Sequence, residues 1–150
     1  MKLSTRSRYG LRAMFDLAQH EGEGPISLKS IAERQGLSEH YLEQLVSGLR
    51  KAGLVESTRG AQGGYFLGKE ASQIRVGDVI RVLEGSIAPV DCVSEEDPEC
   101  CQNSRYCVTR TVWEKMRDSI TEVVDSITLE DMVQDAKGRE SECNFNIFDQ

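Results

Sequence analysis

The sequence contains no long hydrophobic run and few of the residue patterns that enzymes use. No segment has 18 consecutive apolar residues, and the N-terminal MKLSTRSRYG lacks the apolar stretch of a signal peptide. We therefore expect a soluble protein of the cytoplasm. Only two histidines are present, His20 and His40, and there is neither a phosphate-binding glycine loop with its lysine nor a nucleophile elbow. We do not expect an enzyme.

The net charge of −7 hides an asymmetry between the two parts of the chain. Residues 1–90 carry 12 Lys and Arg against 10 Asp and Glu, a net charge of +2, whereas residues 91–150 carry 6 against 15, a net charge of −9. Nucleic-acid binding needs a positive face. The numbers fit an N-terminal part that touches DNA and an acidic part that does not, although an ordinary solvated surface would also produce them.

Three helices are predicted in the first third of the chain. The segment SRYGLRAMFDLAQHEG has apolar residues at the i, i+3, i+4, i+7 spacing of an amphipathic helix. Ser27 and Ser38 are suitable N-caps for two further helices, and Gly36 and Gly53 are suitable stops. Two short helices joined by a tight glycine turn form a helix-turn-helix pattern.

A β-hairpin is predicted directly after these helices. LVEST and YFLGK are strand-like, and RGAQGG between them is typical of a turn. The order helix, turn, helix, hairpin is that of a winged helix, and a hairpin that serves only as a structural clip is the alternative interpretation. We therefore expect a mainly α fold, in which a winged helix-turn-helix domain with a two-stranded β-wing precedes a long C-terminal dimerisation helix.

The second half of the chain predicts three more helices. SQIRVGDVIRVLEG is typical of a short helix, and Thr128 with Asp131 is suited to capping a final one, LEDMVQDA. Between them, apolar residues recur every three or four positions over about five turns: Val108, Val112, Met116, Ile120, Val124 and Ile127. A helix of that length either packs back on its own core or pairs with a second copy, and pairing is the interpretation we adopt.

These predictions divide the chain into four parts. Residues 1–90 would form the DNA-binding domain and residues 91–107 a cysteine-containing loop that binds a cluster. Residues 108–136 would form the dimerisation helix and the final short helix, and residues 137–150 a tail without clear periodicity.

The second helix of a helix-turn-helix lies in the major groove, and its first turns meet the base edges. Gln44 is able to pair with adenine and Glu43 to accept a hydrogen bond from cytosine, although a surface glutamate is more often simply solvated. Arg59, at the hairpin tip, suits a minor groove. The predicted DNA-binding residues are Ser38, His40, Tyr41, Glu43, Gln44, Ser47, Arg50 and Arg59.

The segment DCVSEEDPECCQNSRYCVTRTVW holds four of the five cysteines, among acidic and polar residues. In a reducing compartment, clustered cysteines bind metal or sense redox state more often than they form structural disulfides. A disulfide, a metal or cluster site and free thiols all remain open at this point. Cys143, alone in the tail, is expected to take no part.

The sequence resembles the Rrf-type winged-helix regulators over roughly residues 1–133. The segments that carry the resemblance are MKLSTRSRYGLRAMFDLA, SLKSIAERQGLSEHYLEQLVSGLRKAGLVESTRGAQGGYFLGK and ITLEDMV. It implies a homodimeric transcription factor, with Tyr41, Glu43 and Gln44 in the major groove and Arg59 in the minor groove. Such a dimer would bind a palindromic operator in double-stranded DNA.

Relatives that sense iron and sulfur have three cysteines between the wing and the dimer helix, and Cys92, Cys101 and Cys107 match them. The resemblance implies a 2Fe-2S cluster on these thiolates. The chain departs from the pattern at Arg110, where the iron-sulfur regulator has a histidine ligand, because a guanidinium cannot ligate. The fourth ligand would then be Cys100, Glu99, a residue of the partner chain or an exogenous thiol, since Arg8 replaces the acidic ligand of other relatives.

Two alternatives keep the DNA-binding function but not the cluster. Zinc would occupy the same thiols in one, and free thiols would act as a redox switch in the other. The segment GDVIRVLEGSIAPV also resembles the cysteine-metabolism repressor of this family, which implies cysteine synthase as a partner. An iron-sulfur electron carrier, a third class, would need no DNA-reading helix.

Overall fold

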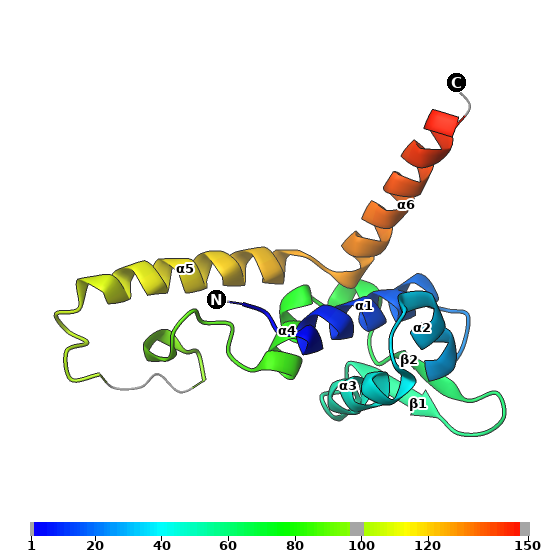
Figure 1. Ribbon diagram of the computed structural model, residues 1–150, viewed down its shortest axis with the longest axis horizontal. Coiled ribbons are helices and arrows are strands. Elements are labelled where there is room, and N and C mark those ends of the chain that lie inside the picture. The colour runs from blue at the N-terminus through cyan, green and yellow to red at the C-terminus, as the bar shows by residue number, and fades with distance from the viewer. Residues whose placement is uncertain (1, 97–100, 148–150) are drawn as a thin grey trace.

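The computed structural model describes residues 2–96 and 101–147 and shows a mainly helical chain with one two-stranded antiparallel sheet (Figure 1). This is the predicted fold class. The elements in chain order are α1 (Thr5–Gln19), α2 (Leu28–Gln35), α3 (Glu39–Lys51), β1 (Val55–Thr58), β2 (Gly64–Leu67), the 3₁₀ turn η1 (Ala71–Gln73), α4 (Val76–Glu84), the 3₁₀ turn η2 (Asp91–Val93), α5 (Val108–Ser126) and α6 (Leu129–Ile147).

The helix-turn-helix has the caps that the sequence predicts. The Ser27 hydroxyl accepts a hydrogen bond from the Ser30 N–H at 3.1 Å, and the Ser38 hydroxyl accepts one from the Tyr41 N–H at 3.3 Å. Between the two helices, Gly36 has φ 64° and ψ 38°, a left-handed conformation that costs a residue with a Cβ more than glycine. These local signals fix the length of the turn and the start of α3.

One hydrophobic core joins α1, α2, α3 and α4. Met14 of α1, Ile31 of α2 and Leu42 of α3 are fully buried, and Val79 of α4 is buried with them. Leu129, the first residue of α6, is also fully buried in this core. The C-terminal part of the chain is therefore anchored to the winged domain by packing as well as by the covalent connection.

A buried carboxylate ties α1 to α2. Asp16 is 0% exposed and accepts hydrogen bonds from Arg34 at 2.9 and 2.7 Å and from Gln35 at 3.0 Å. Burial raises the pKa of Asp16, but the hydrogen bonds from Arg34 and Gln35 and the charges of Arg34 and His20 outweigh it and lower the pKa overall. Asp16 is therefore held in its charged form, as a buried anion with its partners in place.

The wing is connected to the rest of the domain by a third extended segment. Tyr65 of β2 exchanges backbone hydrogen bonds of 2.7 and 2.8 Å with Ile26, just before α2. A Cβ placed on Gly64 would lie 2.5 Å from the Ile26 carbonyl oxygen. Only glycine permits this close approach, so Gly64 helps to fix the direction of the hairpin.

The last two helices extend away from the winged domain (Figure 1). No residue of α5 is buried, and large apolar side chains of this helix are exposed: Val108, Val112, Met116 and Val123. Ile120 and Val124 pack against the small buried cluster of Val76, Ile80 and Ile87. Within the described part of the chain, the predicted apolar stripe is thus mostly uncovered.

The final helix is longer than the sequence pattern indicated. Thr128 and Asp131 form the predicted reciprocal cap, with hydrogen bonds of 2.9 and 3.1 Å. The helix then continues to Ile147, so the predicted boundary at residue 136 does not end it. Residues 137–147 contain no proline, and the Arg139–Asp135 pair at 2.9 Å supports a helical turn across the boundary.

Candidate DNA interface and cysteine segment

The rotation of α3 is set by its apolar side. Leu42, Leu45, Val46 and Leu49 are all at most 1% exposed. Their burial leaves the opposite side of the helix in solvent. Five of the predicted DNA-binding residues lie exposed on α3: His40, Glu43, Gln44, Ser47 and Arg50.

Tyr41 differs from its neighbours because its ring is half-buried. The ring stands edge-on to Tyr9 of α1, with centroids 6.0 Å apart, and its hydroxyl lies 3.2 Å from the Thr5 hydroxyl. Tyr41 therefore joins α3 to α1, a role that the sequence analysis missed. The Thr5–Tyr9 spacing of four residues on one face of α1 is the only sequence signal that indicates it.

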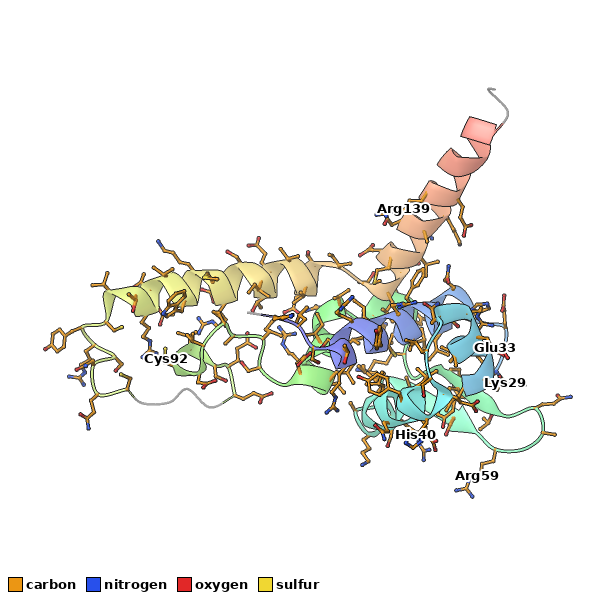
Figure 2. All side chains as sticks on the ribbon, viewed as in Figure 1. Lys29, Glu33, His40, Arg59, Cys92 and Arg139 are labelled. Carbon is orange, nitrogen blue, oxygen red and sulfur yellow. The ribbon has the colours of Figure 1, made fainter. Side chains whose placement is uncertain are left out.

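Two arginines give this side of the domain positive charge. Arg50, in the last turn of α3, lines a polar hollow with Glu43, Ser47 and Tyr65. Arg59 lies exposed just after β1 and projects from the wing on the same side as His40 (Figure 2). Neither arginine forms an ion pair with any residue in the described ranges. Their charges are free to meet phosphate oxygens.

The side chains of His40 and Gln44 approach each other at the start of α3. Their Nε2 atoms are 3.3 Å apart, at the i, i+4 spacing of adjacent helical turns. Ser38, which precedes them, is exposed while its hydroxyl caps the helix. The first two turns of α3 thus present both hydrogen-bond donors and hydrogen-bond acceptors, as base-edge readout requires.

The three matched cysteines lie on different parts of the segment between the winged domain and α5. Cys92 belongs to η2 and is half-buried, Cys101 is exposed, and Cys107 is the half-buried residue immediately before α5. All three are free thiols in this structure. Cys100 and Glu99, the proposed fourth ligands, lie outside the described residues.

Among the described residues, three ligands of a metal do not come together. In residues 2–96 and 101–147, no group of three Cys, His, Asp or Glu side chains is placed to hold a metal ion. A common site for Cys92, Cys101 and Cys107 would require the segment to close. The donor chemistry nevertheless fits, because thiolates are the usual ligands of iron-sulfur clusters and zinc.

Cys107 has the environment of a thiolate. A hydrogen bond from the Thr109 hydroxyl, with the two atoms 3.2 Å apart, lowers the pKa of Cys107, and the backbone N–H groups of Arg110 and Thr109 lower it further. The Arg110 guanidinium pairs with Glu114 at 3.0 Å, so its charge is directed along α5. Arg110 therefore acts on the Cys107 thiol through its backbone N–H and its positive charge, not as a ligand.

Comparison with known proteins identifies the family of this DNA-binding arrangement. Residues 3–135 match the model of the Rrf2 family, described as iron-dependent transcriptional regulators. The chain belongs to the Rrf2 family. Members of this family are DNA-binding transcriptional regulators and not enzymes, and the same holds for this chain. The helical fold with a β-wing agrees with its structural neighbours.

CymR and IscR are among the named relatives, both as sequences and as solved structures. CymR of Bacillus subtilis is 52% identical over 147 residues, covering 98% of this chain and 100% of CymR. Its solved structure, that of a global cysteine regulator, has a TM-score of 0.75 and covers 89% of this chain and 97% of that one. The structure of IscR from T. potens is 61% identical in sequence, has a TM-score of 0.74, and covers 91% of this chain and 88% of that one. IscR of Pectobacterium atrosepticum is 47% identical over 133 residues, which cover 89% of this chain and 79% of that IscR.

No helix in the described ranges has both the length and the hydropathy that a membrane crossing needs.

Proposed function

We propose that this Rrf2 regulator is a cytoplasmic repressor that senses iron-sulfur status through a 2Fe-2S cluster on Cys92, Cys101 and Cys107. The observation that carries the proposal is the position of the thiols, between the winged domain and the first turn of α5. The lowered pKa of Cys107 favours the thiolate that a ligand must be. The 61% identity to the T. potens IscR supports the same assignment.

The cysteine segment itself supplies the mechanism. Three thiolates drawn together repel one another, so the closed segment is unfavourable without a cationic core. Cys92, Cys101 and Cys107 would hold the cluster, whose positively charged core would offset part of their thiolate charge. Cys92 would then be held close to Cys107, which fixes the path of the chain between α4 and α5.

We also propose that a second copy of the chain covers the exposed apolar stripe of α5. Val112, Met116 and Val123 are 50%, 38% and 58% exposed, which is unusual for one helix of a stable monomer. Pairing along α5 would place two recognition helices about one turn of DNA apart, roughly 34 Å, on a palindromic operator. Light scattering after size exclusion tests this, and a monomer at all concentrations would refute it.

Anaerobic purification with an absorption spectrum and iron and sulfide analysis tests the cluster. Cys92→Ala, Cys101→Ala and Cys107→Ala should each abolish the cluster absorption while the protein remains folded by circular dichroism. Cys100→Ala is the matched control and should retain at least part of the absorption. Equal bleaching by Cys100→Ala would make that residue a ligand, and zinc without sulfide in the wild type would replace the cluster by a zinc site.

A cluster-free cysteine regulator is the second candidate. Two observations favour it: the 52% identity to CymR over its entire length, and Arg110 in the position of the family histidine. Such a regulator would respond through thiol oxidation or through cysteine synthase as a partner. Operator binding that follows thiol oxidation or added cysteine synthase, in protein without iron and sulfide, would establish this alternative.

A further inference from the structure

Arg81 of α4 lies at a junction of three segments. Its guanidinium donates to both carboxylate oxygens of Asp125 in α5, at 2.7 and 2.9 Å. Its Nε atom is 3.5 Å from a carboxylate oxygen of Glu95, three residues after Cys92. These hydrogen bonds and charges raise the pKa of Arg81, Asp125 having the largest effect, so the guanidinium remains charged.

The joint between α4 and α5 does not depend on Glu95. Backbone hydrogen bonds of 2.9 Å connect Val76 to Ile127 and Leu129 to Ile74. A Cβ on Gly77 would collide with the Asp125 carboxylate, which shows how closely the two elements approach. Removing the Glu95 carboxylate would therefore leave this joint in place.

The segment after Cys92 is held against α5 and reaches Arg81 from there. The Arg117 guanidinium donates to the Val93 carbonyl oxygen at 3.1 Å, and the Thr121 hydroxyl donates to Glu95 at 3.1 Å. Glu95 is thus the one residue of this segment, among those described, that forms an ion pair with α4. Because Glu95 follows Cys92 by only three residues, a displacement of Cys92 should also displace the Glu95 carboxylate.

From α4 the contacts continue to the recognition helix. Leu83 packs over Gly10 of α1, and Glu84 accepts a hydrogen bond from Ser7 at 2.8 Å. Tyr9 of α1 in turn packs edge-on against Tyr41 of α3. A displacement of α4 therefore has a packed route to the DNA-binding face.

We infer that the Glu95–Arg81 pair is a coupling clamp, through which a shift of residues 92–95 on ligand binding at Cys92 changes the position of α4 and hence the DNA affinity. The inference rests on the proposed cluster function and names the residues that regulate it. Arg81 and Glu95 are positioning residues in this scheme. Their side chains are 28% and 34% exposed, so the pair contributes little to stability and its removal should affect coupling more than folding.

Glu95→Gln tests the clamp with the smallest change in shape. The measurement is the operator affinity of cluster-loaded and cluster-free protein, whose ratio in the wild type should lie in the roughly 5- to 150-fold range of typical coupling. In Glu95→Gln the ratio should fall about two- to fivefold, the share that a partly exposed pair can contribute, with the absorption spectrum retained. Arg139→Gln, which removes a surface pair with Asp135, is the control and should keep the wild-type ratio.

A wild-type ratio in Glu95→Gln would overturn the inference, and so would loss of the absorption spectrum, because Glu95 would then belong to the cluster site. Hydrogen exchange of cluster-free protein gives a second, independent readout. Amides of residues 91–96 should exchange faster in Glu95→Gln than in the wild type and in Arg139→Gln. If the wild type takes up no iron and sulfide, the proposed function fails, and unchanged exchange in Glu95→Gln would overturn the clamp itself.

Discussion

Asp16→Asn should destabilise the protein because it removes a buried charge that has three donors around it. Asparagine keeps the shape of the side chain but replaces one acceptor oxygen with an N–H donor. That donor would face Arg34 or Gln35, which already donate to Asp16 at 2.7 to 3.0 Å. Two charge-assisted hydrogen bonds from Arg34 therefore become weaker or are lost.

The expected loss is about 2 kcal/mol in the free energy of unfolding. A hydrogen bond to a charged group contributes roughly 1.5–3 kcal/mol. The Arg34 side chain is 39% exposed and is hydrated again when its partner is lost, so we place the combined loss of both hydrogen bonds near the lower end of this range. For a chain of this length, about 2 kcal/mol corresponds to a decrease of roughly 4–8 °C in the melting temperature.

The pH dependence separates the charge from the shape of the side chain. Because the pKa of folded Asp16 lies below its unfolded value, the charge stabilises the protein fully above the unfolded value of about 3.9. This stability is lost as the pH falls through the lower, folded pKa. Urea unfolding of wild type and Asp16→Asn should therefore differ at pH 7 and converge at acidic pH.

An unfolding difference of the same size at neutral and acidic pH would refute the reasoning, since it would show that the carboxylate charge is not responsible. A double-mutant cycle with Arg34→Gln provides the control. The two residues are in direct contact, so their interaction free energy should be about 1 kcal/mol or more. The protein concentration should be held fixed, because the proposed dimer would make the apparent stability depend on concentration.

Three further outcomes are expected. Glu43→Ala should relax sequence preference more than it lowers total affinity, with about 1–3 kcal/mol per base contact at stake, whereas Arg59→Ala should weaken binding to all sequences. Gel shifts on operator and random DNA measure both effects, and an equal loss of affinity for the two DNAs in Glu43→Ala would contradict the expectation. Gly64→Ala should displace the wing and reduce operator affinity, because the added Cβ collides with Ile26 before α2. The control Gly138→Ala, which has open space around its Cβ, should keep the wild-type affinity, and an unchanged affinity of Gly64→Ala would contradict the expectation. The rate of Cys107 alkylation should fall at a lower pH than that of a cysteine peptide, and Thr109→Val should shift this fall to higher pH, because the Thr109 hydrogen bond lowers the Cys107 pKa. Identical pH profiles for Cys107 and the peptide would refute a lowered pKa.

Local signals in the sequence determined the DNA-binding half of the fold. The serine caps at 27 and 38 and the glycine at 36 act within three or four residues of themselves, so they could be read without knowing any distant contact. The 3.6-residue period of α3 likewise showed which side faces the core. The exposed positions of Glu43, Gln44 and Arg50 follow from that period alone.

Tertiary structure decided what the other residues do. Whether Tyr41 points to solvent or packs on Tyr9 depends on the angle between α1 and α3, which no local pattern encodes. The cysteine segment is a second case: its composition shows which ligand types are present, but only the folded structure shows whether they lie close enough to share a metal.

The Arg81–Asp125 pair joins residues 44 positions apart, and Ser4 and Glu84 meet across 80. The sequence therefore determined which side chains could read DNA or hold a cluster. How a change at one of these sites could reach the other was decided only when folding placed α4 between them, because long-range contacts depend on the relative rotation of packed helices rather than on spacing along the chain.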